Sequence, residues 1–577
     1  MLTDSVPQTN NRRLTMLAFC LTFGFSVIVG QLVRYQIIDH TQLNQKVLTE
    51  RTREKDLPAK RGYIADVNGN LLAVDVVRWD ISVSPLLVPE NRKGELADRL
   101  ATLLDMPRDQ VSTTLTTKAD WLPLAAHVDQ EAGETIADLK VDGIICEPKP
   151  LRVYPEGSLF AHLLGIVNDA GDGFYGVEGY YDLPLKGSAG KKRVEQNTGG
   201  EEIPFPPVSD SPPKAGTSLV LTVDRNIQYI VQEELQRALE EFGAESGTVV
   251  VMDPRTGAIL ASTSLPAYNP NDFTGTDLSL MADPVVSNLW EPGSIFKVVT
   301  WSAGLDSGTI SPGTTFYDDG ALEVGGRVIQ NWDRQGHGLV TMQDGLIQSL
   351  NTVASFISTS MGKDRFYTYL RRFGFGQLTE VDLDSEGPGM MKLPGDSNWF
   401  PSDLGTNSFG QGIAVTPMQM ITAISAVANR GIMMKPYIVH QFITANVSGW
   451  ERVVQVDPMT VRRAISEEAA KTMTQMLVTV VEREGYSKAQ IPGYGIAGKT
   501  GTAQIPTAYG YDPNHTIASF VGFAPADDPQ FAILVKLDKP QVSPWGTQTA
   551  APAFQAIAQR LFMYLQIPPD EIRLANQ

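Results

Sequence analysis

Cysteine, histidine and excess positive charge are all scarce in this chain. Its 577 residues include six histidines and only two cysteines, Cys20 and Cys146. Two cysteines so far apart exclude a disulfide framework, although they do not settle the cellular compartment. Lys and Arg number 47 against 65 Asp and Glu, so the net charge is −18 and no overall positive field attracts nucleic acid.

Internal repeats and long low-complexity tracts are also missing. The chain is 42% hydrophobic and 19% charged, which fits neither a mainly disordered nor a collagen-like protein. The length suggests about four domains and excludes a single small module. The sequence therefore predicts a multidomain protein with sizeable cores.

One long apolar run stands near the start, at residues 14–33, and contains no charged residue. Its length suits a helix that crosses a bilayer. A cleaved signal peptide would end in small residues, which are missing before Arg34, and a buried core helix is the other alternative. Arg12 and Arg13 precede the run, so positive-inside counting predicts a cytoplasmic tail at 1–13, an uncleaved signal anchor at 14–34 and an extracytoplasmic remainder.

Two further domains are predicted after the anchor. Residues 35–200 mix β-like runs such as 79–83 with helix-like runs such as 91–104, which favours an elongated α+β module. Residues 195–217 are rich in proline, glycine and acids, so we expect a linker at 201–217. A second domain should then occupy 218–566, followed by a tail at 567–577.

The second domain is predicted to contain one antiparallel sheet flanked by helices. Apolar runs on either side of 254–257 and 526–529 indicate two hairpins. Residues 550–564 read as a terminal helix. Asp224 opens a helix whose apolar face carries Ile227, Val231, Leu235, Leu239 and Phe242. Strands at both ends with helices between them indicate a sheet closed by the first and last segments.

Ser294 and Lys297 form the first candidate catalytic pair. They stand three apart after a Pro-Gly turn, at the start of an apolar helical run, and so share one helix face. A helix start favours developing negative charge on the serine, and desolvation lowers a lysine pKa toward the range of a base. A purely structural role is the alternative, in which the serine caps the helix and the lysine extends its charged end to solvent. Ser211 and Lys214 repeat them, but the prolines between prevent a helix.

Two other short patterns carry candidate polar groups. Ser349 and Asn351 lie between helix-like stretches at 341–348 and 352–361, where such residues are common for structural reasons. Lys499, Thr500, Gly501 and Thr502 precede the last hairpin and suit an edge strand. There the lysine would supply charge, the threonines hydroxyl donors, and the glycine room for a substrate backbone.

Three other motifs compete with this set. Residues 493–500 match a P-loop, but proline and polar residues surround them where a strand and a helix are required. Asp333 and His337 suggest a Ser-His-Asp hydrolase, yet no G-x-S-x-G elbow surrounds Ser294. Residues 331–338 are instead expected to form a loop. A zinc site at His337 is not expected, because no cysteine lies in that region.

In combination, the patterns S-x-x-K, S-x-N and K-T-G are far more specific than any one of them. The chain resembles a class B penicillin-binding protein of the division or elongation type. Residues 61–69 resemble the RGxIxDRNG motif of that family, with Val67 where arginine is usual. Further matches are residues 152–155, 176–178, 221–224 and 408–420. Within the last, Thr416, Pro417 and Gln419 also fit a helix start.

The resemblance implies a transpeptidase domain with a serine β-lactamase-like fold and a role for each motif. Ser294 would attack between the two D-alanines of a peptidoglycan stem peptide, with Lys297 as base and Ser349 as proton relay to the leaving D-alanine. Asn351 would hold the donor amide. Lys499, Thr500 and Thr502 would bind its terminal carboxylate, beside Gly501. Backbone N–H groups of Ser294 and Thr502 would form the oxyanion hole.

The resemblance also implies what surrounds the reaction. No cofactor or metal is required, and β-lactams enter as substrate mimics. A polytopic SEDS-type glycosyltransferase and other division or elongation membrane proteins are the expected partners, at the bacterial plasma membrane, because nothing in the chain resembles a glycosyltransferase domain. The alternatives are a membrane-anchored β-lactamase or D,D-carboxypeptidase, a β-lactam sensor, and a divisome scaffold.

Overall fold

The computed structural model describes residues 9–43, 52–195, 210–445, 451–483, 488–508 and 510–575. These residues form two compact units. One comprises residues 1–60 and 187–215, and the other comprises 61–186 and 216–577. Each unit therefore contains segments that are separated in sequence.

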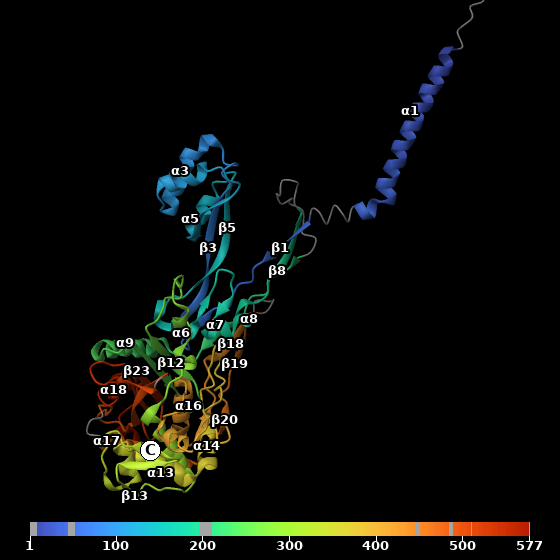
Figure 1. Cartoon of the computed structure of the whole chain (residues 1–577). Helices are drawn as coiled ribbons and strands as arrows, with labels where there is room; N and C mark the ends of the chain where they lie inside the picture. The colour runs from blue at the N-terminus through green and yellow to red at the C-terminus, as the bar shows by residue number, and fades with distance from the viewer. Residues whose placement is uncertain are drawn as a thin grey trace, which may run out of the picture. The chain divides into compact units, whose positions relative to one another are not determined.

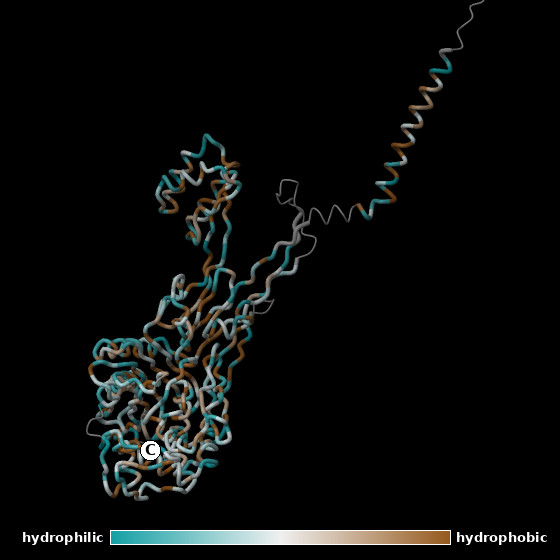
Figure 2. The backbone as a smooth tube through the Cα atoms, viewed as in Figure 1, coloured by the Kyte–Doolittle hydropathy of each residue, from teal (hydrophilic) through white to brown (hydrophobic). Residues whose placement is uncertain are grey.

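The first unit holds the apolar N-terminal helix. Helix α1 (Thr9–Val33) continues into a π-helical turn, η1 (Arg34–Ile38), and apolar residues predominate along its middle (Figure 2). The span Asn11–Ile38 has a mean hydropathy of 2.1 and is long and apolar enough to cross a membrane. The unit also contains a three-stranded antiparallel sheet of β1 (Thr52–Leu57), β8 (Gly190–Glu195) and β9 (Asp210–Ser211). Most of the expected linker, residues 201–209, lies outside the described residues.

The second unit begins with the α+β module. Strand β3 (Leu71–Val83) pairs antiparallel with β4 (Leu122–Val128) and with β5 (Ile144–Val153). Helices pack at one end of this ribbon around Ile81, Leu100 and Leu115 (Figure 1). They are η2 (Glu90–Arg92), α3 (Lys93–Leu104), α4 (Arg108–Thr116) and α5 (Gln130–Ala137). The strand expected at 79–83 and the helix expected at 91–104 are both present.

A buried ionic network holds the base of this module. Glu178 is fully buried and accepts from Arg61 Nη2 at 2.6 Å and from Arg152 Nε at 2.7 Å. Arg152 also reaches Asp75 at 3.0 Å. The network joins three of the sequence matches, at 61–69, 152–155 and 176–178. The short elements around it are η3 (Gly157–Phe160), α6 (Ala161–Leu164), β6 (Ile166–Val167), β7 (Gly173–Phe174), α7 (Gly176–Tyr180) and α8 (Asp182–Lys186).

One sheet joins the α+β module to the larger domain. Its order is β19-β18-β10-β2-β3-β4, with β5 also on β3. Strand β10 (Ser218–Leu221) runs parallel to β2 (Ile64–Ala65) and antiparallel to β18 (Val439–Ala445), which pairs with β19 (Glu451–Gln455). The expected boundaries at 35–200 and 218–566 stay a prediction, since the strands of both segments share this sheet.

A five-stranded antiparallel sheet forms the centre of the larger domain, in the order β12-β11-β23-β22-β21. On β11, Val249 and Val251 share an apolar cluster with residues of α9 and α18, whereas Val250 and Met252 share one with residues of α16, as the period-two alternation of a strand dictates. The strands are β11 (Ser246–Met252), β12 (Ile259–Leu265), β21 (Ala497–Thr507), β22 (Gly510–Ala524) and β23 (Phe531–Asp538). The helices are α9 (Arg225–Phe242), α16 (Pro417–Ala428) and α18 (Ala550–Tyr564). Both predicted hairpins are confirmed. The predicted antiparallel sheet, in which the first strands of the domain pair with its last strands, is confirmed as well.

The middle of the domain is mainly helical, as predicted. It contains η4 (Leu278–Leu280), α10 (Pro284–Ser287), η5 (Gly293–Phe296), α11 (Lys297–Asp306), α12 (Met342–Ile347), α13 (Asn351–Met361), α14 (Lys363–Arg372), α15 (Asp403–Thr406), η6 (Asn407–Phe409) and α17 (Glu467–Arg483). Small antiparallel pairs are formed by β13 (Thr315–Asp318) with β16 (Gly338–Thr341), β14 (Ala321–Val324) with β15 (Arg327–Gln330), and β17 (Ile432–Met434) with β20 (Thr460–Arg463). Helix α19 (Asp570–Ala575) lies in the expected C-terminal tail.

Candidate active site

Ser294 and Lys297 lie where a tight turn enters a buried helix. The turn η5 leads directly into α11, and Gly293 adopts a positive φ of 57° just before the serine. Lys297 is completely buried, whereas Ser294 is partly exposed and lines a cavity. The predicted helical placement of the pair is therefore present.

The Lys297 ammonium lies against the S-x-N segment. Its Nζ is 2.6 Å from the Ser349 carbonyl oxygen, 3.2 Å from Ser349 Oγ and 2.9 Å from Asn351 Oδ1. Burial, followed by the positive charge of Lys499, holds the pKa of Lys297 well below its ordinary value. A lysine in this state can accept a proton from a neighbouring hydroxyl.

Ser349 occupies the bend between α12 and α13. Its φ is 56°, in the left-handed region that non-glycine residues seldom adopt. In this conformation its carbonyl oxygen and its hydroxyl both reach Lys297. Asn351 is the first residue of α13 and donates from Nδ2 to the Gln330 carbonyl oxygen at 3.1 Å. Strained backbone at a polar cluster is a common feature of functional sites.

The K-T-G residues lie on β21, the edge strand of the central sheet, as predicted. Lys499 is fully buried and Thr500 nearly so. A Cβ added at Gly501 would come within 2.4 Å of Ser519 Oγ and 3.0 Å of Ile295 Cγ2, so a larger residue would have to displace these side chains where the strand passes the nucleophile turn. Thr502 Oγ1 accepts a hydrogen bond from the Gly546 N–H at 3.2 Å.

A second close backbone contact supports the nucleophile from behind. Gly410 follows η6 with a φ of 80°, and a Cβ there would lie 2.4 Å from the Gly293 carbonyl oxygen. Thr300 Oγ1 donates to the Ser408 carbonyl oxygen at 2.7 Å. The segment 408–420 therefore packs directly against η5 and α11. This packing against the nucleophile turn gives a structural reason for the motif at residues 408–420.

One cavity of about 540 Å³ brings the three motifs together. Ser294, Ser349, Thr500, Gly501 and Thr502 line it. The buried Lys297 lies behind it, bonded to Ser349 and to Asn351. The candidate residues, which are spread over more than 200 positions of the sequence, thus converge on one nucleophile.

Comparison with known families identifies this arrangement. Residues 247–559 match the model of the penicillin binding protein transpeptidase domain, and residues 56–221 match that of the penicillin-binding protein dimerisation domain. This chain belongs to the penicillin-binding proteins. The resemblance to the class B members of the family is confirmed.

Relatives of this penicillin-binding protein match along nearly their whole lengths. Stage V sporulation protein D of Bacillus subtilis (strain 168) is 33% identical over 570 residues, which cover 97% of this chain and 87% of that protein. Peptidoglycan D,D-transpeptidase FtsI of Escherichia coli (strain K12) is 30% identical over 573 residues, covering 98% and 94%. A crystal structure of penicillin binding protein 3 from Mycobacterium tuberculosis with aztreonam superposes with a TM-score of 0.69 at 28% identity, over 89% of this chain and 98% of that one.

The cavity of this penicillin-binding protein also has lining residues that the motifs did not indicate. Trp332 and Trp545 meet edge to face, with ring centroids 5.4 Å apart, and their side chains are substantially exposed. His337, which the sequence offered only through competing motifs, also lines the cavity. The remaining unpredicted lining residues are Ile347, Gln348, Arg483, Thr547 and Gln548. Exposed aromatic side chains are the signal that could have pointed to this rim, but exposure cannot be read from a sequence.

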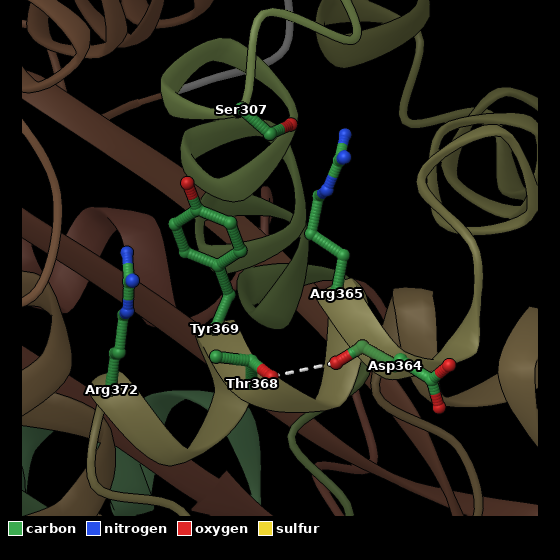
Figure 3. A pocket seen from close by; sticks show the side chains of 6 residues that line it. All are labelled: Ser307, Asp364, Arg365, Thr368, Tyr369 and Arg372. Atoms are coloured by element: carbon green, nitrogen blue, oxygen red, sulfur yellow. Dashed lines mark hydrogen bonds between the residues drawn. The ribbon is translucent and has the colours of Figure 1, made fainter.

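A second cavity, of about 360 Å³, has different chemistry (Figure 3). It is lined by Ser307 after α11 and by Asp364, Arg365, Thr368, Tyr369 and Arg372 of α14. Thr368 Oγ1 donates to the Asp364 carbonyl oxygen at 2.7 Å within that helix. No lysine is among the described residues that line it, so this lining lacks the nucleophile and base pair of the first cavity.

The structure also accounts for the competing motifs. Lys499 and Thr500 of the P-loop match lie within a strand, so no helix N-terminus follows them to bind phosphate. Ser211 lies in β9, and Lys214 forms an isolated antiparallel bridge with Ser188, which excludes a shared helix face. His337 lies in a loop as expected, with Nε2 3.0 Å from Asp333 Oδ2, and it lines the cavity that contains Ser294.

Proposed function

We propose that this chain is a peptidoglycan D,D-transpeptidase that works through an acyl-enzyme on Ser294. The observation that carries the proposal is the buried Lys297, which follows Ser294 by three residues at the start of α11 and bonds Ser349 of the same cavity, and whose pKa is held well below its ordinary value. Its neutral amine can accept the Ser294 proton as the hydroxyl attacks the carbonyl carbon between the two terminal D-alanines. Membership of the penicillin-binding proteins supports the same chemistry.

The remaining motif residues then have definite tasks. Ser349, bonded to Lys297 Nζ through its hydroxyl and its carbonyl, passes the proton to the departing D-alanine. Lys499, Thr500 and Thr502 bind the donor carboxylate from β21, and Asn351 holds its amide. The N–H groups of Ser294 and Thr502 stabilise the oxyanion, whose charge develops only in the tetrahedral state.

The second half of the reaction transfers the acyl group to an amine of a neighbouring stem peptide. A C–N bond forms, the ester bond to Ser294 Oγ breaks, and the serine recovers its proton. β-Lactams enter the same cavity as mimics of the donor and leave a slowly released acyl group on Ser294. None of these steps requires a cofactor.

We also propose a membrane arrangement. Helix α1 anchors the chain in the bacterial plasma membrane, with the N-terminal tail in the cytoplasm because Arg12 and Arg13 precede the apolar span. The catalytic domain is then extracytoplasmic, where its substrate lies. A SEDS-type polytopic glycosyltransferase supplies the glycan strands, contacted through α1 and the dimerisation-type module.

Labelling the full chain in detergent with a fluorescent penicillin tests this function. We expect stable label on Ser294, mapped by mass spectrometry of the modified peptide, and no label on Ser294→Ala. Release of the label within minutes would instead indicate a β-lactamase. Absence of label from folded wild-type protein would contradict the catalytic assignment and leave a scaffold.

A further inference from the structure

A histidine lines the cavity of the nucleophile, bonded to a neighbouring aspartate, and neither residue has a part in the Ser294, Lys297 and Ser349 chemistry. His337 and Asp333 lie in the loop between β15 and β16, and both side chains are about four-fifths buried. His337 Nε2 is 3.0 Å from Asp333 Oδ2. A carboxylate can only accept, so this bond places the imidazole proton on Nε2 and leaves Nδ1 with a free lone pair.

The loop is fixed against the helix that follows the S-x-N motif. Asn331 Nδ2 donates to Asp318 Oδ2 at 2.7 Å, and Thr352 Oγ1 donates to Asp318 Oδ1 at 2.9 Å. The His337 N–H donates to the same Asp318 carboxylate at 3.2 Å. Trp332 Nε1 donates to the Gln348 carbonyl oxygen, next to Ser349, at 3.1 Å. The position of the imidazole is therefore set by the same framework that sets Ser349.

Transpeptidation includes a proton transfer that this set of residues can perform. The acceptor amine arrives as an ammonium at neutral pH and must lose one proton before its nitrogen can attack. It loses a second proton as the ester bond breaks, and Ser294 Oγ takes that one. Lys297 and Ser349 manage the proton of Ser294, so the first proton needs another acceptor.

We propose that His337, oriented by Asp333, is the general base that deprotonates the acceptor ammonium in the second half-reaction, an inference that rests on the proposed transpeptidase function. Nδ1 takes one proton and the neutral amine attacks the acyl carbon. The C–N bond forms, the bond from carbon to Ser294 Oγ breaks, and the imidazolium releases its proton to water. Imidazole suits this role because it takes up and returns protons near neutral pH.

The charged groups near His337 are two carboxylates beside its loop and several basic side chains around the cavity. Asp333 faces the ring from the same loop and Asp318 faces the loop backbone from the end of β13. Arg483, at the end of α17, lines the same cavity, and Lys297 and Lys499 lie buried behind it. The two carboxylates offset the positive charge on the ring, and the charges of Arg483 and Lys499 favour release of the proton once the acyl group has moved.

Kinetics of the two half-reactions, measured on the full chain in detergent, test the proposal. For His337→Gln we expect unchanged acylation by a fluorescent penicillin. With a pentapeptide donor ending in D-Ala-D-Ala and D-methionine as acceptor, kcat/KM for the acceptor should fall about 10²-fold. Hydroxylamine, which is already neutral at neutral pH, should restore aminolysis to within a few-fold of wild type, because it needs no base before attack.

Two further variants separate a base from a structural role. Arg334→Gln changes an exposed side chain of the same loop and should leave both half-reactions unchanged. Asp333→Asn keeps the ring but not its tautomer, so acceptor kcat/KM should fall and its pH profile should shift. Unchanged D-methionine transfer in His337→Gln, an equal loss with hydroxylamine, or loss of penicillin acylation would each overturn the role of His337. Absence of label on wild type would overturn the transpeptidase function itself.

Discussion

At the residue scale, the site depends on how a lysine is kept neutral. Lys297 has three oxygen acceptors around its Nζ, which by themselves favour the ammonium. Complete burial and the nearby charge of Lys499 act in the opposite direction and dominate its pKa. The same contacts therefore hold the amine in place while its surroundings remove the proton.

The pH dependence of acylation follows from this balance. Because the pKa of Lys297 is lowered, the amine is neutral above that pKa, and acylation should fall as the pH drops through it. Removing the Lys499 charge in Lys499→Met should raise the pKa of Lys297 and move the acid limb of the penicillin acylation profile to higher pH. Stopped-flow acylation rates across pH measure both midpoints.

An exposed lysine outside the three motifs provides the control for Lys499→Met. Lys471→Met removes an exposed charge from α17 and should leave the acid limb where it is in wild type. An acid limb that does not move in Lys499→Met would show that the two lysines are not coupled. Lys297→Met should lower the acylation rate by about 10²-fold or more at every pH, because no other group replaces the base.

At the scale of single elements, the local rules of helix capping are obeyed at several starts. Asp224 caps α9 by accepting from the Asn226 and Ile227 N–H groups, and Thr416 with Gln419 forms a capping box on α16. Asp283 caps α10 in the same way, but it is fully buried and its Oδ2 has no hydrogen-bond partner among the described residues. Burial raises the pKa of this carboxyl to about 6.

Asp283 should therefore make stability depend on pH. Its folded pKa lies above the unfolded value of 3.8, so its favourable contribution is complete below that value and is lost as the pH rises through about 6. Asp283→Asn keeps a capping oxygen and removes the buried charge. At neutral pH the variant should gain up to about 3 kcal/mol in free energy of unfolding, since each pKa unit corresponds to roughly 1.4 kcal/mol, and at low pH it should gain nothing. Thermal unfolding midpoints across pH provide the measurement.

Asp277 offers a matched cap that is exposed. Its Oδ1 accepts from the Ser279 N–H, which lowers the pKa of Asp277, so Asp277→Asn should not gain stability at neutral pH. Equal pH dependence in wild type and Asp283→Asn would mean that the pKa of Asp283 is the same in the folded and unfolded protein, which would contradict the prediction.

At the scale of the whole second unit, the α+β module and the catalytic domain share structure. Leu219 and Val220 of β10 pair with Ile64 and Ala65 of β2. The Arg225 N–H, at the start of α9, donates to Asp66 Oδ2 at 3.0 Å. One buried apolar cluster contains residues of both segments, Ile64, Leu72, Tyr154 and Phe160 together with Leu219, Val250 and Ile259. Each segment therefore completes part of the other's core.

A chain cut at this boundary should consequently be unstable. A protein of residues 218–577 loses the β2 partner of β10 and exposes apolar surface that the cluster buries, so it should unfold at a lower temperature than residues 61–577 or aggregate. The longer chain keeps β2, β3 and the Glu178 network and is the control. Equal unfolding midpoints for the two chains would contradict the shared core.

The sequence by itself determined those features that depend on neighbouring residues. The spacing of Ser294 and Lys297, the cap of α9 and the two hairpins of the central sheet follow from local geometry, and the combined motifs indicated the family. Tertiary structure alone decided which residues distant in sequence come into contact at the site. The left-handed backbone of Ser349, the contact of Gly410 with Gly293 and the place of His337 in the nucleophile cavity all depend on segments distant in sequence. Burial by those segments also lowers the pKa of Lys297, because desolvation is a property of the packed fold and not of the local sequence.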